Sequence, residues 1–429
     1  MKMRVLFKKT FLYPLMLLLF SLSAQGQGSD ELIKYQLQKE GVTFSNDNSL
    51  ALLISGQEKF DDMFEAIRQA KSSIHMDYFN FRNDSIAHLL FDLLAQKAKE
   101  GVEVRTVFDG WGNDSNNKPL KKSHLEAIRA TGVQIYEFDP MRFPWINHGF
   151  SRDHRKIVVI DGKIAYTGGM NVADYYIKGT EQVGEWRDMH CRIEGEEVNT
   201  LQRIFLRHWY RVTGEDLSHE AKYYRLSAHA GGYFHDLKPD TTASVGHKTI
   251  GIVNREPKVS PKIMRQFYNN AINDAKDSIK IINPYFSLTH SVRKSLRNAL
   301  KRGVKVEIMI SAKSDIPVTP DVVLQNSHML MKRGGHIWIY QPGFHHSKIM
   351  MVDGKFCTIG SANLNSRGTR FDFEENAVIL DSCVTRQLDD MFERDKKKCT
   401  YLTPELWKEL RTPFQILRGK LFRLLTIWI

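Results

Sequence analysis

The chain has 429 residues, of which 42% are hydrophobic, and a formal charge of +12 at pH 7. This length and composition exclude a disordered or fibrous protein and suit two domains or two tightly joined halves. The positive charge fits an anionic lipid surface, nucleic acid or an ordinary soluble surface, and by itself it does not choose among them.

The N-terminus has the order of features that is typical of a secretory signal peptide. Four basic residues within the first nine precede an apolar run over residues 11–22 and small residues that end at Gly26. The run is shorter than the stretch of about 20 residues that a membrane-spanning helix needs. We therefore expect residues 1–26 to be a signal peptide or an uncleaved N-terminal anchor, and the protein to be exported or membrane-associated.

From about residue 50 onward the predicted elements occur twice. A helix with apolar residues from Phe60 to Ile67 leads into a strand from Ser72, and the same order returns in residues 264–272 and from Asp277. In each half an amphipathic helix and a further strand follow, then a third helix and strand. This order predicts an α/β sandwich in each half, with a mostly parallel sheet.

The repeat also predicts the domain boundaries. We expect a first half over 50–215, a polar connector over 216–247, a second half over 248–402 and a C-terminal tail over 403–429. The tail has the pattern of a basic amphipathic helix, which either lies on a membrane surface or packs against the domain. Its apolar and basic residues are Phe414, Leu417, Leu421, Leu424, Leu425 and Trp428, with Arg411, Arg418 and Lys420.

The first half carries 11 extra residues between Asp139 and His154. Residues 143–146 of this insertion read Phe-Pro-Trp-Ile. A loop of this composition either enters a membrane interface, where tryptophan is favoured, or folds onto the core. The sequence leaves both interpretations open.

The four cysteines do not form a metal-binding pattern. They include no C-x-x-C pair and lie far from histidine clusters, so we expect no metal and no other cofactor. Cys357 occupies the position that Ala165 has in the other half, which predicts a small core residue. Cys383 and Cys399 are possible disulfide partners in an exported protein, although spacing alone does not show a bond.

The most informative feature is a motif, H-x-K-x4-D, that occurs twice. It appears at His154, Lys156 and Asp161 and again at His346, Lys348 and Asp353, each time followed by an asparagine 17 residues after the histidine, Asn171 or Asn363. Two copies with shared flanking sequence are not a chance match. They predict a single site that is built from both halves.

These residue types suit the transfer of a phosphoryl-linked group without a metal. A neutral histidine attacks phosphorus, and a second one donates a proton to the leaving oxygen. The two lysines supply fixed positive charge, and neutral donors such as Ser361 add hydrogen bonds to the same phosphate oxygens. Gly168, Gly169 and Gly360 are either turn residues or positions where backbone N–H groups approach the ligand.

With its duplicated motif the chain resembles the phospholipase D superfamily from about residue 53 to 402, and within it bacterial cardiolipin synthases. The supporting segments include RDHRKIVVIDG, GGMNVADYY, EWRDMH, FLRHWY, NPYF and FHHSKIMMVDG. The resemblance implies two phospholipase D-like halves related by a pseudo-twofold axis, with the active site between them. It also implies a covalent phosphatidyl-histidine intermediate and a place in the bacterial cell envelope.

The resemblance assigns roles to individual residues. It implies catalysis by His154, Lys156, His346 and Lys348, with His154 as the expected nucleophile and His346 as acid and base. The family's phosphate-binding positions match Asn171, Asn363 and Ser361, with Gly169 at the place of Ser361 in the first half. Asp188 and Glu374 match the carboxylates that orient the histidine rings, and Asp161 and Asp353 match structural aspartates.

The function predicted first is cardiolipin synthesis, in which two phosphatidylglycerol molecules give cardiolipin and glycerol. We expect the partners to be anionic phospholipids and a membrane surface rather than nucleic acid, and the protein to be active as a monomer. The alternatives are a phospholipase D that releases phosphatidic acid, a phosphodiesterase or nuclease, and a membrane-binding scaffold without activity. Cardiolipin synthases usually begin with two membrane helices, and the signal-like N-terminus departs from that pattern.

Overall fold

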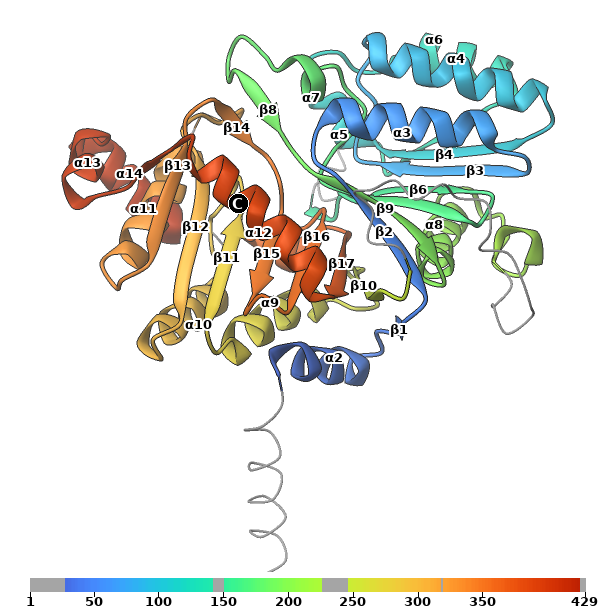
Figure 1. Ribbon diagram of the computed structural model, residues 1–429. Helices are drawn as coiled ribbons and strands as arrows, with labels where there is room; N and C mark the ends of the chain where they lie inside the picture. The colour runs from blue at the N-terminus through green and yellow to red at the C-terminus, as the bar shows by residue number, and fades with distance from the viewer. Residues whose placement is uncertain (1–27, 142–149, 226–245, 318, 425–429) are drawn as a thin grey trace, which may run out of the picture.

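The computed structural model describes residues 28–141, 150–225, 246–317 and 319–424. Figure 1 shows two halves side by side, each with a sheet that carries helices on its outer face. Within the described residues, no helix is both long enough and apolar enough to cross a bilayer. The predicted signal segment 1–26 and the insertion loop 143–146 lie outside the described residues.

The first half contains a seven-stranded sheet whose strands follow the order β2, β9, β7, β6, β3, β4, β5. Every residue of β3 and of β6 is buried, because helices cover one face of the sheet and the second half covers part of the other. The bounds are β2 (Asn48–Leu53), β3 (Ser73–Tyr78), β4 (Glu103–Asp109), β5 (Gln134–Phe138), β6 (Lys156–Ile160), β7 (Ile164–Gly168) and β9 (His190–Gly195).

The second half repeats this sheet. Its seven central strands follow the order β10, β17, β16, β15, β11, β12, β13, with β1 and β18 added at the two edges. The bounds are β1 (Phe44–Ser45), β10 (Thr249–Arg255), β11 (Ser278–Ile282), β12 (Lys305–Ser311), β13 (His336–Tyr340), β15 (Ile349–Val352), β16 (Phe356–Gly360), β17 (Glu374–Leu380) and β18 (Cys399–Tyr401). The duplication read from the sequence is therefore present in the order of the strands.

The prediction of mostly parallel sheets was wrong. Only β3, β4 and β5, and correspondingly β11, β12 and β13, pair in parallel; the other pairs in both sheets are antiparallel. The strands that carry the motif form hairpins, β6 with β7 and β15 with β16. Asp161 and Gly162 turn the first hairpin, and Asp353 and Gly354 the second, all four with positive φ as a tight hairpin turn requires.

The helices lie in chain order between the strands. The predicted apolar faces of α3 and α9 are buried, and in α4 Leu90 is buried whereas its neighbour Leu89 is 58% exposed. The bounds are α3 (Gly56–Gln69), α4 (Ser85–Lys99), α5 (Gly110–Asp114), α6 (Lys122–Ala130), α7 (Tyr175–Lys178) and α8 (Glu197–Thr213), then α9 (Ile263–Asp274), α10 (His290–Lys301), α11 (Thr319–Met331) and α12 (Ser382–Lys396).

A shared core joins the two halves. The inner faces of both sheets, together with α8 and α12, form one apolar cluster that includes Ile157, Val159, Ile349 and Met351 from the two motif strands. Cys357 is buried in this cluster, as predicted. A two-stranded sheet of β8 (Glu185–Arg187) and β14 (Gly343–His345) adds a second link. The two motifs therefore begin strands that face each other across one core.

Residues 28–45 precede the first half in sequence but pack on the second half. Helix α2 (Ser29–Lys39) buries Ile33 and Leu37 in the same apolar cluster as residues of α9, and β1 pairs with β10. The chain thus starts on the second half before it enters the first. This crossing of the chain adds a further link between the two halves.

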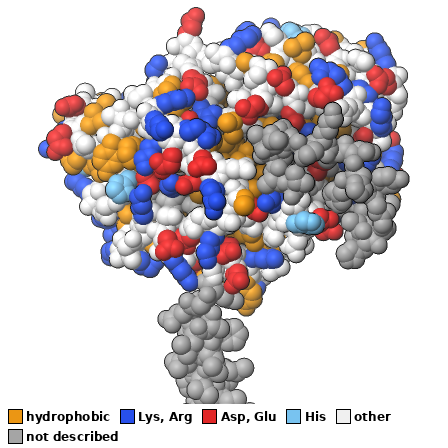
Figure 2. Space-filling view, viewed as in Figure 1, with side chains coloured by type: hydrophobic (Ala, Val, Ile, Leu, Met, Phe, Trp, Pro, Cys, Tyr) orange, Lys and Arg blue, Asp and Glu red, His pale blue; other side chains and the backbone are white. Residues whose placement is uncertain are grey.

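The C-terminal tail is helical and packs with one face only. Helices α13 (Pro404–Glu409) and α14 (Pro413–Leu424) lie against α11, and Arg411 pairs with Asp321 at 2.7 Å. Phe414, Leu417 and Leu421 of α14 are more than half exposed. Figure 2 shows apolar side chains gathered at the end of the second half where α13 lies. Residues Leu425 and Trp428 of the predicted apolar face lie outside the described part.

The possible disulfide between Cys383 and Cys399 is not formed. Both are free cysteines. Cys383 lies in the first turn of α12, and Cys399 lies beyond its last residue, at the start of β18. A helix of 15 residues spans about 22 Å, several times the Cα separation that a disulfide tolerates. The two thiols are therefore held apart by the fold.

Candidate active site

Both motif histidines lie at the entrance of a hairpin strand. His154 precedes β6, which begins at Lys156, and His346 follows β14 and precedes β15. Because side chains alternate along an extended chain, the H-x-K spacing places each histidine and its lysine on the same side. His154 and His346 are largely buried, with side chains that are 14% and 7% exposed.

Each lysine contacts its own histidine in the same way. The Nζ groups of Lys156 and Lys348 donate to the backbone carbonyls of His154 and His346, respectively. Lys348 Nζ also lies 2.9 and 3.0 Å from the two ring nitrogens of His346. Burial and then the charge of Lys348 lower the pKa of His346 to about 4. Burial lowers the pKa of Lys348 to about 7.

The histidines are oriented by carboxylates from the opposite half. Nδ1 of His154 lies 3.1 Å from an oxygen of Glu374, and Nδ1 of His346 lies 2.7 Å from an oxygen of Asp188. Asp188 belongs to the first half and Glu374 to the second, so each pair spans the interface. A carboxylate at Nδ1 leaves Nε2 as the nitrogen that can react.

The two carboxylates differ in charge. Burial would raise the pKa of Asp188, but the charges of Lys348 and His346 hold it at about 2. Burial raises the pKa of Glu374 to about 7, against the opposing charge of Lys156. Near neutral pH, Asp188 is therefore ionised and raises the pKa of His346 against the effects of burial and Lys348, whereas Glu374 is close to half protonated.

The charge around His154 keeps that ring neutral. Burial, followed by the charges of Lys156 and Lys348, holds the pKa of His154 well below its usual range. The influence of Lys348, a residue of the second half, also shows that the two motifs share one electrostatic environment. A neutral imidazole in positive surroundings is suited to attack an anionic phosphodiester.

A hydrogen-bond network connects Glu374 with the first half. The hydroxyl of Ser361 donates to Glu374 at 2.5 Å and to Glu375 at 3.2 Å. Glu375 also accepts a hydrogen bond of 2.7 Å from Thr167 on β7. The predicted phosphate donor Ser361 therefore bonds to the carboxylate that holds His154.

Asn171 and Asn363 lie buried beside the site with unused hydrogen-bonding capacity. Among the described residues, both side-chain oxygens are buried without a partner. The amides are 5% and 6% exposed. Buried polar atoms are normally paired. The unpaired atoms are oxygens, which accept hydrogen bonds, so a donor group of a ligand, such as a hydroxyl, would complete them as they stand.

Gly169 makes room for Asp188. A Cβ atom at this position would lie 2.2 Å from the Asp188 carboxylate, and the Gly169 N–H donates to the carbonyl of Met189. Gly168 and Gly360 likewise lie against neighbouring strands, at His190 and Asn376. The structure therefore gives these glycines a packing reason, and direct contact of Gly169 with a phosphate stays a prediction.

The motif aspartates are away from the reacting groups. Asp161 accepts backbone hydrogen bonds from Lys71, Ser72 and Ser73, at 2.7 to 2.9 Å. Asp353 accepts the equivalent bonds from residues 276–278, at 2.8 to 3.2 Å. Each aspartate joins its hairpin turn to the start of the neighbouring strand. This geometry fits the structural role that the resemblance implies.

A buried ion cluster supports the backbone in front of His154. Asp153 pairs with Arg155 at 2.5 Å and with His208 at 2.7 Å, and His208 also lies 2.8 Å from Asp77. The side chains of Asp77, Asp153 and His208 lie close enough together to hold a metal ion. The guanidinium of Arg155, 3.6 Å from Asp77, already supplies positive charge, which favours an ion-pair cluster.

Several residues of this site were not predicted from the sequence. Glu375, Asp153, His208 and Lys59 received no role, although Asp153 and His208 stand in segments that support the resemblance. Lys59 is fully buried on α3, with its Nζ 3.5 Å from the carbonyl of Asn171. A lysine on the apolar face of an amphipathic helix was the available signal.

Together, the described residues can bind an anionic phosphodiester between two histidines of different character. One ring is neutral and held by a partly protonated glutamate. The other ring is also neutral near pH 7, since its pKa is about 4, and it is held by an ionised aspartate that raises its affinity for a proton. This arrangement suits nucleophilic attack from one side and proton transfer on the other.

Comparison with known proteins gives a consistent picture. A family model described as "Cardiolipin synthase, PLD-like domain" matches residues 63–209 and 268–396. The cardiolipin synthase of Oceanobacillus iheyensis is 34% identical over 380 residues, which cover 88% of this chain and 75% of that protein. The probable cardiolipin synthase YwiE of Bacillus subtilis is 32% identical over 376 residues, 87% of this chain and 71% of that protein.

Solved structures support the fold. The phosphatidylserine synthase of Haemophilus influenzae matches with a TM-score of 0.68 at 16% identity and covers 94% of this chain and 100% of that one. The polyphosphate kinase of Porphyromonas gingivalis matches with a TM-score of 0.52 at 14% identity, over 84% of this chain and 49% of that one. At these identities the likeness concerns the fold alone.

Proposed function

Because the chain belongs to the cardiolipin synthase family of phospholipase D-like enzymes, we propose that it moves a phosphatidyl group between two phosphatidylglycerol molecules and so makes cardiolipin and glycerol. The observation that carries the proposal is the pair of histidines, each held by a carboxylate of the opposite half. The enzyme class and the use of phospholipid substrates follow from the family, and the steps below are our proposal.

In the first step His154 is the nucleophile. Its Nε2 attacks the phosphorus of one phosphatidylglycerol, and the bond from phosphorus to the headgroup glycerol oxygen breaks. His346 donates its Nε2 proton to that oxygen, so glycerol leaves and a phosphatidyl-His154 intermediate remains. His346 is neutral at rest, so in this proposal it takes up its proton when the anionic phosphodiester binds, and the ionised Asp188 behind it favours that proton.

In the second step the roles reverse. A hydroxyl of a second phosphatidylglycerol loses its proton to His346 and attacks the phosphorus, and the bond from phosphorus to His154 breaks. Cardiolipin leaves, and both histidines return to their starting states. If water replaces the lipid hydroxyl, the same step gives phosphatidic acid, so exclusion of water decides between synthase and hydrolase.

In this proposal the phosphate oxygens are held by the positive charge of the two lysines and by neutral donors. Lys156 and Lys348 balance the charge that develops on the non-bridging oxygens. The side-chain N–H groups of Asn171 and Asn363, both buried, are the proposed neutral donors, and Ser361 acts through its hydrogen bond to Glu374. Gly169, at the place of Ser361, provides space for Asp188 and for the ligand.

We also propose that the protein acts on a membrane surface as a monomer, since both motifs lie in one chain. The exposed apolar face of α14, formed by Phe414, Leu417 and Leu421, is the proposed contact with lipid. Changing all three to Ser is expected to reduce pelleting with anionic vesicles at least severalfold. Leu89→Ser, a change at a similarly exposed leucine of α4, is the control. Equal pelleting of both variants would contradict the proposed contact.

Export is proposed from the N-terminal segment. The N-terminus of the protein isolated from cell envelopes is expected near residue 27 if the segment is cleaved, and at Met1 if it stays as an anchor. Sedimentation of the detergent-solubilised protein tests the monomer. A species of twice the chain mass that alone is active would overturn it.

The proposed activity is tested with purified protein in mixed micelles that contain phosphatidylglycerol as the only phospholipid. Mass spectrometry should find cardiolipin and glycerol in equal amounts, and neither product with the His154→Ala variant. Phosphatidic acid as the sole lipid product would make the protein a hydrolase. Cleavage of nucleic acid with no lipid turnover would replace the proposal with a nuclease.

A further inference from the structure

The two histidines are flanked by aromatic rings with different partners. The ring of Phe79 lies 5.0 Å from the ring of His154, and Trp111 lies 6.1 Å from Phe79. The ring of Tyr285 lies 5.9 Å from the ring of His346, and the Tyr285 hydroxyl donates to Asp315 at 2.7 and 2.8 Å. One flank is apolar, and the other ends in a carboxylate.

The two pairs follow corresponding strands of the two halves, although not at aligned positions. Phe79 follows β3, and Trp111 is the second residue of α5, which comes directly after β4. Tyr285 comes shortly after β11, and Asp315 lies in the segment after β12. Because β3 and β4 correspond to β11 and β12 in sheet order, both pairs lie at the same end of their sheet, next to the histidine of their own half.

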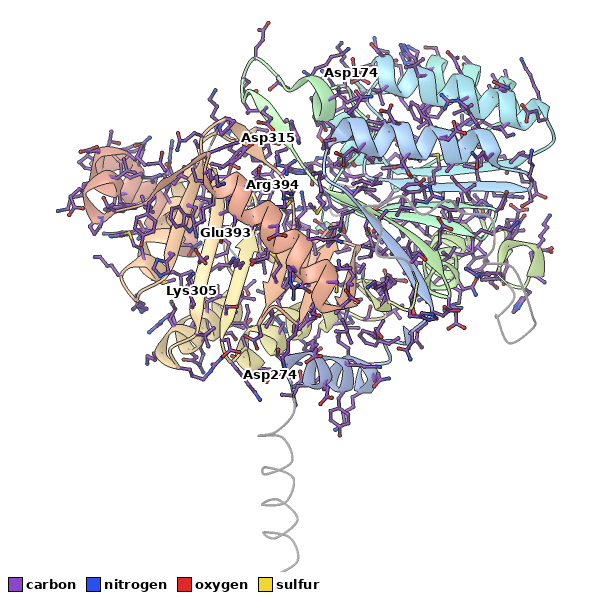
Figure 3. All side chains as sticks on the ribbon, in the orientation of Figure 1. Asp174, Asp274, Lys305, Asp315, Glu393 and Arg394 are labelled. Carbon is purple, nitrogen blue, oxygen red and sulfur yellow. The ribbon has the colours of Figure 1, made fainter. Side chains whose placement is uncertain are left out.

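Asp315 is close enough to influence the reacting groups. It is among the charges that raise the pKa of His346 and of Lys348 against the effect of burial. Both Tyr285 and Asp315 are partly exposed, in contrast to the buried histidine beside them. Figure 3 labels Asp315 in the upper part of the second half, on the side that faces the first.

A carboxylate here is unexpected in a site for an anionic phosphodiester. It repels the phosphate oxygens and accepts hydrogen bonds without donating any. A group that this carboxylate favours must donate hydrogen bonds and carry no negative charge, and the hydroxyls of a polyol meet both conditions. Tyr285, whose hydroxyl already bonds to Asp315, adds an acceptor oxygen at the same place.

We propose that Tyr285 and Asp315 form the alcohol subsite, which binds the glycerol headgroup next to His346. This inference rests on the proposed function, in which His346 serves the alcohol in both steps. In-line displacement places the leaving and the attacking alcohol at the same position opposite His154. One subsite therefore holds the departing glycerol in the first step and the headgroup of the acceptor lipid in the second.

The apolar flank then serves the rest of the lipid. Phe79 and Trp111 offer no carboxylate, and the guanidinium of Arg367 lies 5.4 Å from the Trp111 ring while it pairs with Asp372. Trp111 is 37% exposed, so it can contact a ligand that enters from the surface. An apolar wall beside the nucleophile suits the glycerol ester and acyl part of the phosphatidyl group.

If Tyr285 and Asp315 had a structural role alone, their substitution would have a different effect on activity. Asp315 stands in a segment where Ser314 bonds to Thr319 at 2.7 Å, so the Tyr285 bond also anchors this loop. If anchoring were its sole role, loss of the carboxylate would slow turnover of all donors alike. A subsite for hydroxyl groups instead changes the preference between donors with and without a polyol headgroup.

The experiment is a competition between phosphatidylglycerol and phosphatidylethanol, which lacks the extra hydroxyls, as donors in the same mixed micelles. The ratio of their consumption rates gives the ratio of kcat/KM values. Asp315→Asn and Tyr285→Phe are expected to lower the preference for phosphatidylglycerol about tenfold and about threefold relative to the unmodified protein. Trp111→Phe, on the opposite flank, should leave the ratio unchanged.

The outcomes separate this inference from the proposed function. Both donors lose the same headgroup oxygen whether the acceptor is a lipid or water, so the ratio remains informative if the protein proves to be a hydrolase. An unchanged ratio in Asp315→Asn, with either faster or slower turnover of both donors, would overturn the alcohol subsite. Phosphatidic acid in place of cardiolipin would overturn the synthase alone.

Discussion

The two halves of this protein have the same sheet and the same motif but different chemistry around the histidine. In both halves the hairpin turn is tied by an aspartate, and the lysine contacts its own histidine carbonyl. The carboxylates that hold the rings differ, since the pKa of Asp188 is about 2 and that of Glu374 about 7. The flanking rings differ as well, with Trp111 beside one and Asp315 beside the other.

This comparison teaches that duplication supplied the scaffold and later differences supplied the division of labour. Two identical half-sites would offer two equivalent nucleophiles. In the reaction proposed above, His154 is the nucleophile and His346 is the acid and base. Each assignment depends on a carboxylate from the other half, so neither half is complete by itself.

The largest expected effect comes from removing either histidine. His154→Gln and His346→Gln should each reduce cardiolipin formation by a factor of about 10⁴ or more, because each removes an essential step. The double variant should be hardly worse than either single one, since the two act as a unit. Initial rates in mixed micelles measure this. A single variant that keeps more than a tenth of the activity would break the account.

The carboxylates should differ in importance at pH 7. Asp188→Asn is expected to slow turnover about a thousandfold, because it removes the negative charge that stabilises protonated His346. Glu374→Gln should cost about tenfold, since Glu374 is already close to half protonated. Comparing kcat for the two folded variants at pH 7 checks this order. The reverse order would exchange the roles of the two histidines.

The pH dependence should follow two groups with pKa values near 7. Raising the pH ionises Glu374, which strengthens its hydrogen bond with His154 and makes that ring a better nucleophile. The same rise removes the charge of Lys348, which weakens phosphate binding. The rate should therefore peak near neutral pH.

Two variants test the origin of the rising and falling limbs of the profile of rate against pH. Lys348→Arg keeps its charge at high pH, so the falling limb should move upward by more than one pH unit. Glu374→Gln should lose the rising limb and keep the falling one. Profiles of kcat/KM from pH 5 to 9 supply the measurement. A falling limb that stays in place in Lys348→Arg would exclude Lys348 as its origin.

The smallest effect on activity is expected at the turn aspartates. Asp161→Ala removes the acceptor of three backbone N–H groups and should lower the free energy of unfolding by about 2 kcal/mol. Asp161→Asn should lose less, because asparagine tolerates the positive φ of this turn. Lys163→Ala, at an exposed residue of the same turn, serves as the control in urea unfolding. A large loss of kcat in folded Asp161→Ala would contradict a structural role.

Much of the fold could be predicted from the sequence because it repeats. The apolar faces of α3 and α9, the burial of Cys357 and the shared site all follow from aligned positions. The direction of the strands was predicted wrongly, although the Asp-Gly pairs at Asp161 and Asp353 are hairpin signals. Asp161 and Asp353 were considered only as members of the motif, so the antiparallel hairpins that they turn were not predicted.

Other features depend on contacts between distant residues and leave no local pattern. The pairing of His154 with Glu374 joins positions 220 residues apart, and nothing in either segment specifies that the carboxylate comes from the other half. The packing of α2 on the second half is equally non-local. The contrast between Trp111 and Asp315 becomes visible only once the two sheets are superimposed by strand order.

The most direct test of this account is to identify the histidine that carries the phosphatidyl group. His346→Ala is incubated with a phosphatidyl donor whose leaving group, such as p-nitrophenol, needs no proton, then quenched in alkali, digested and analysed by mass spectrometry. We predict a phosphatidyl adduct on His154, and no adduct on any histidine in the matching His154→Ala sample. An adduct on His346 in the His154→Ala protein, with none on His154 in its counterpart, would contradict the account.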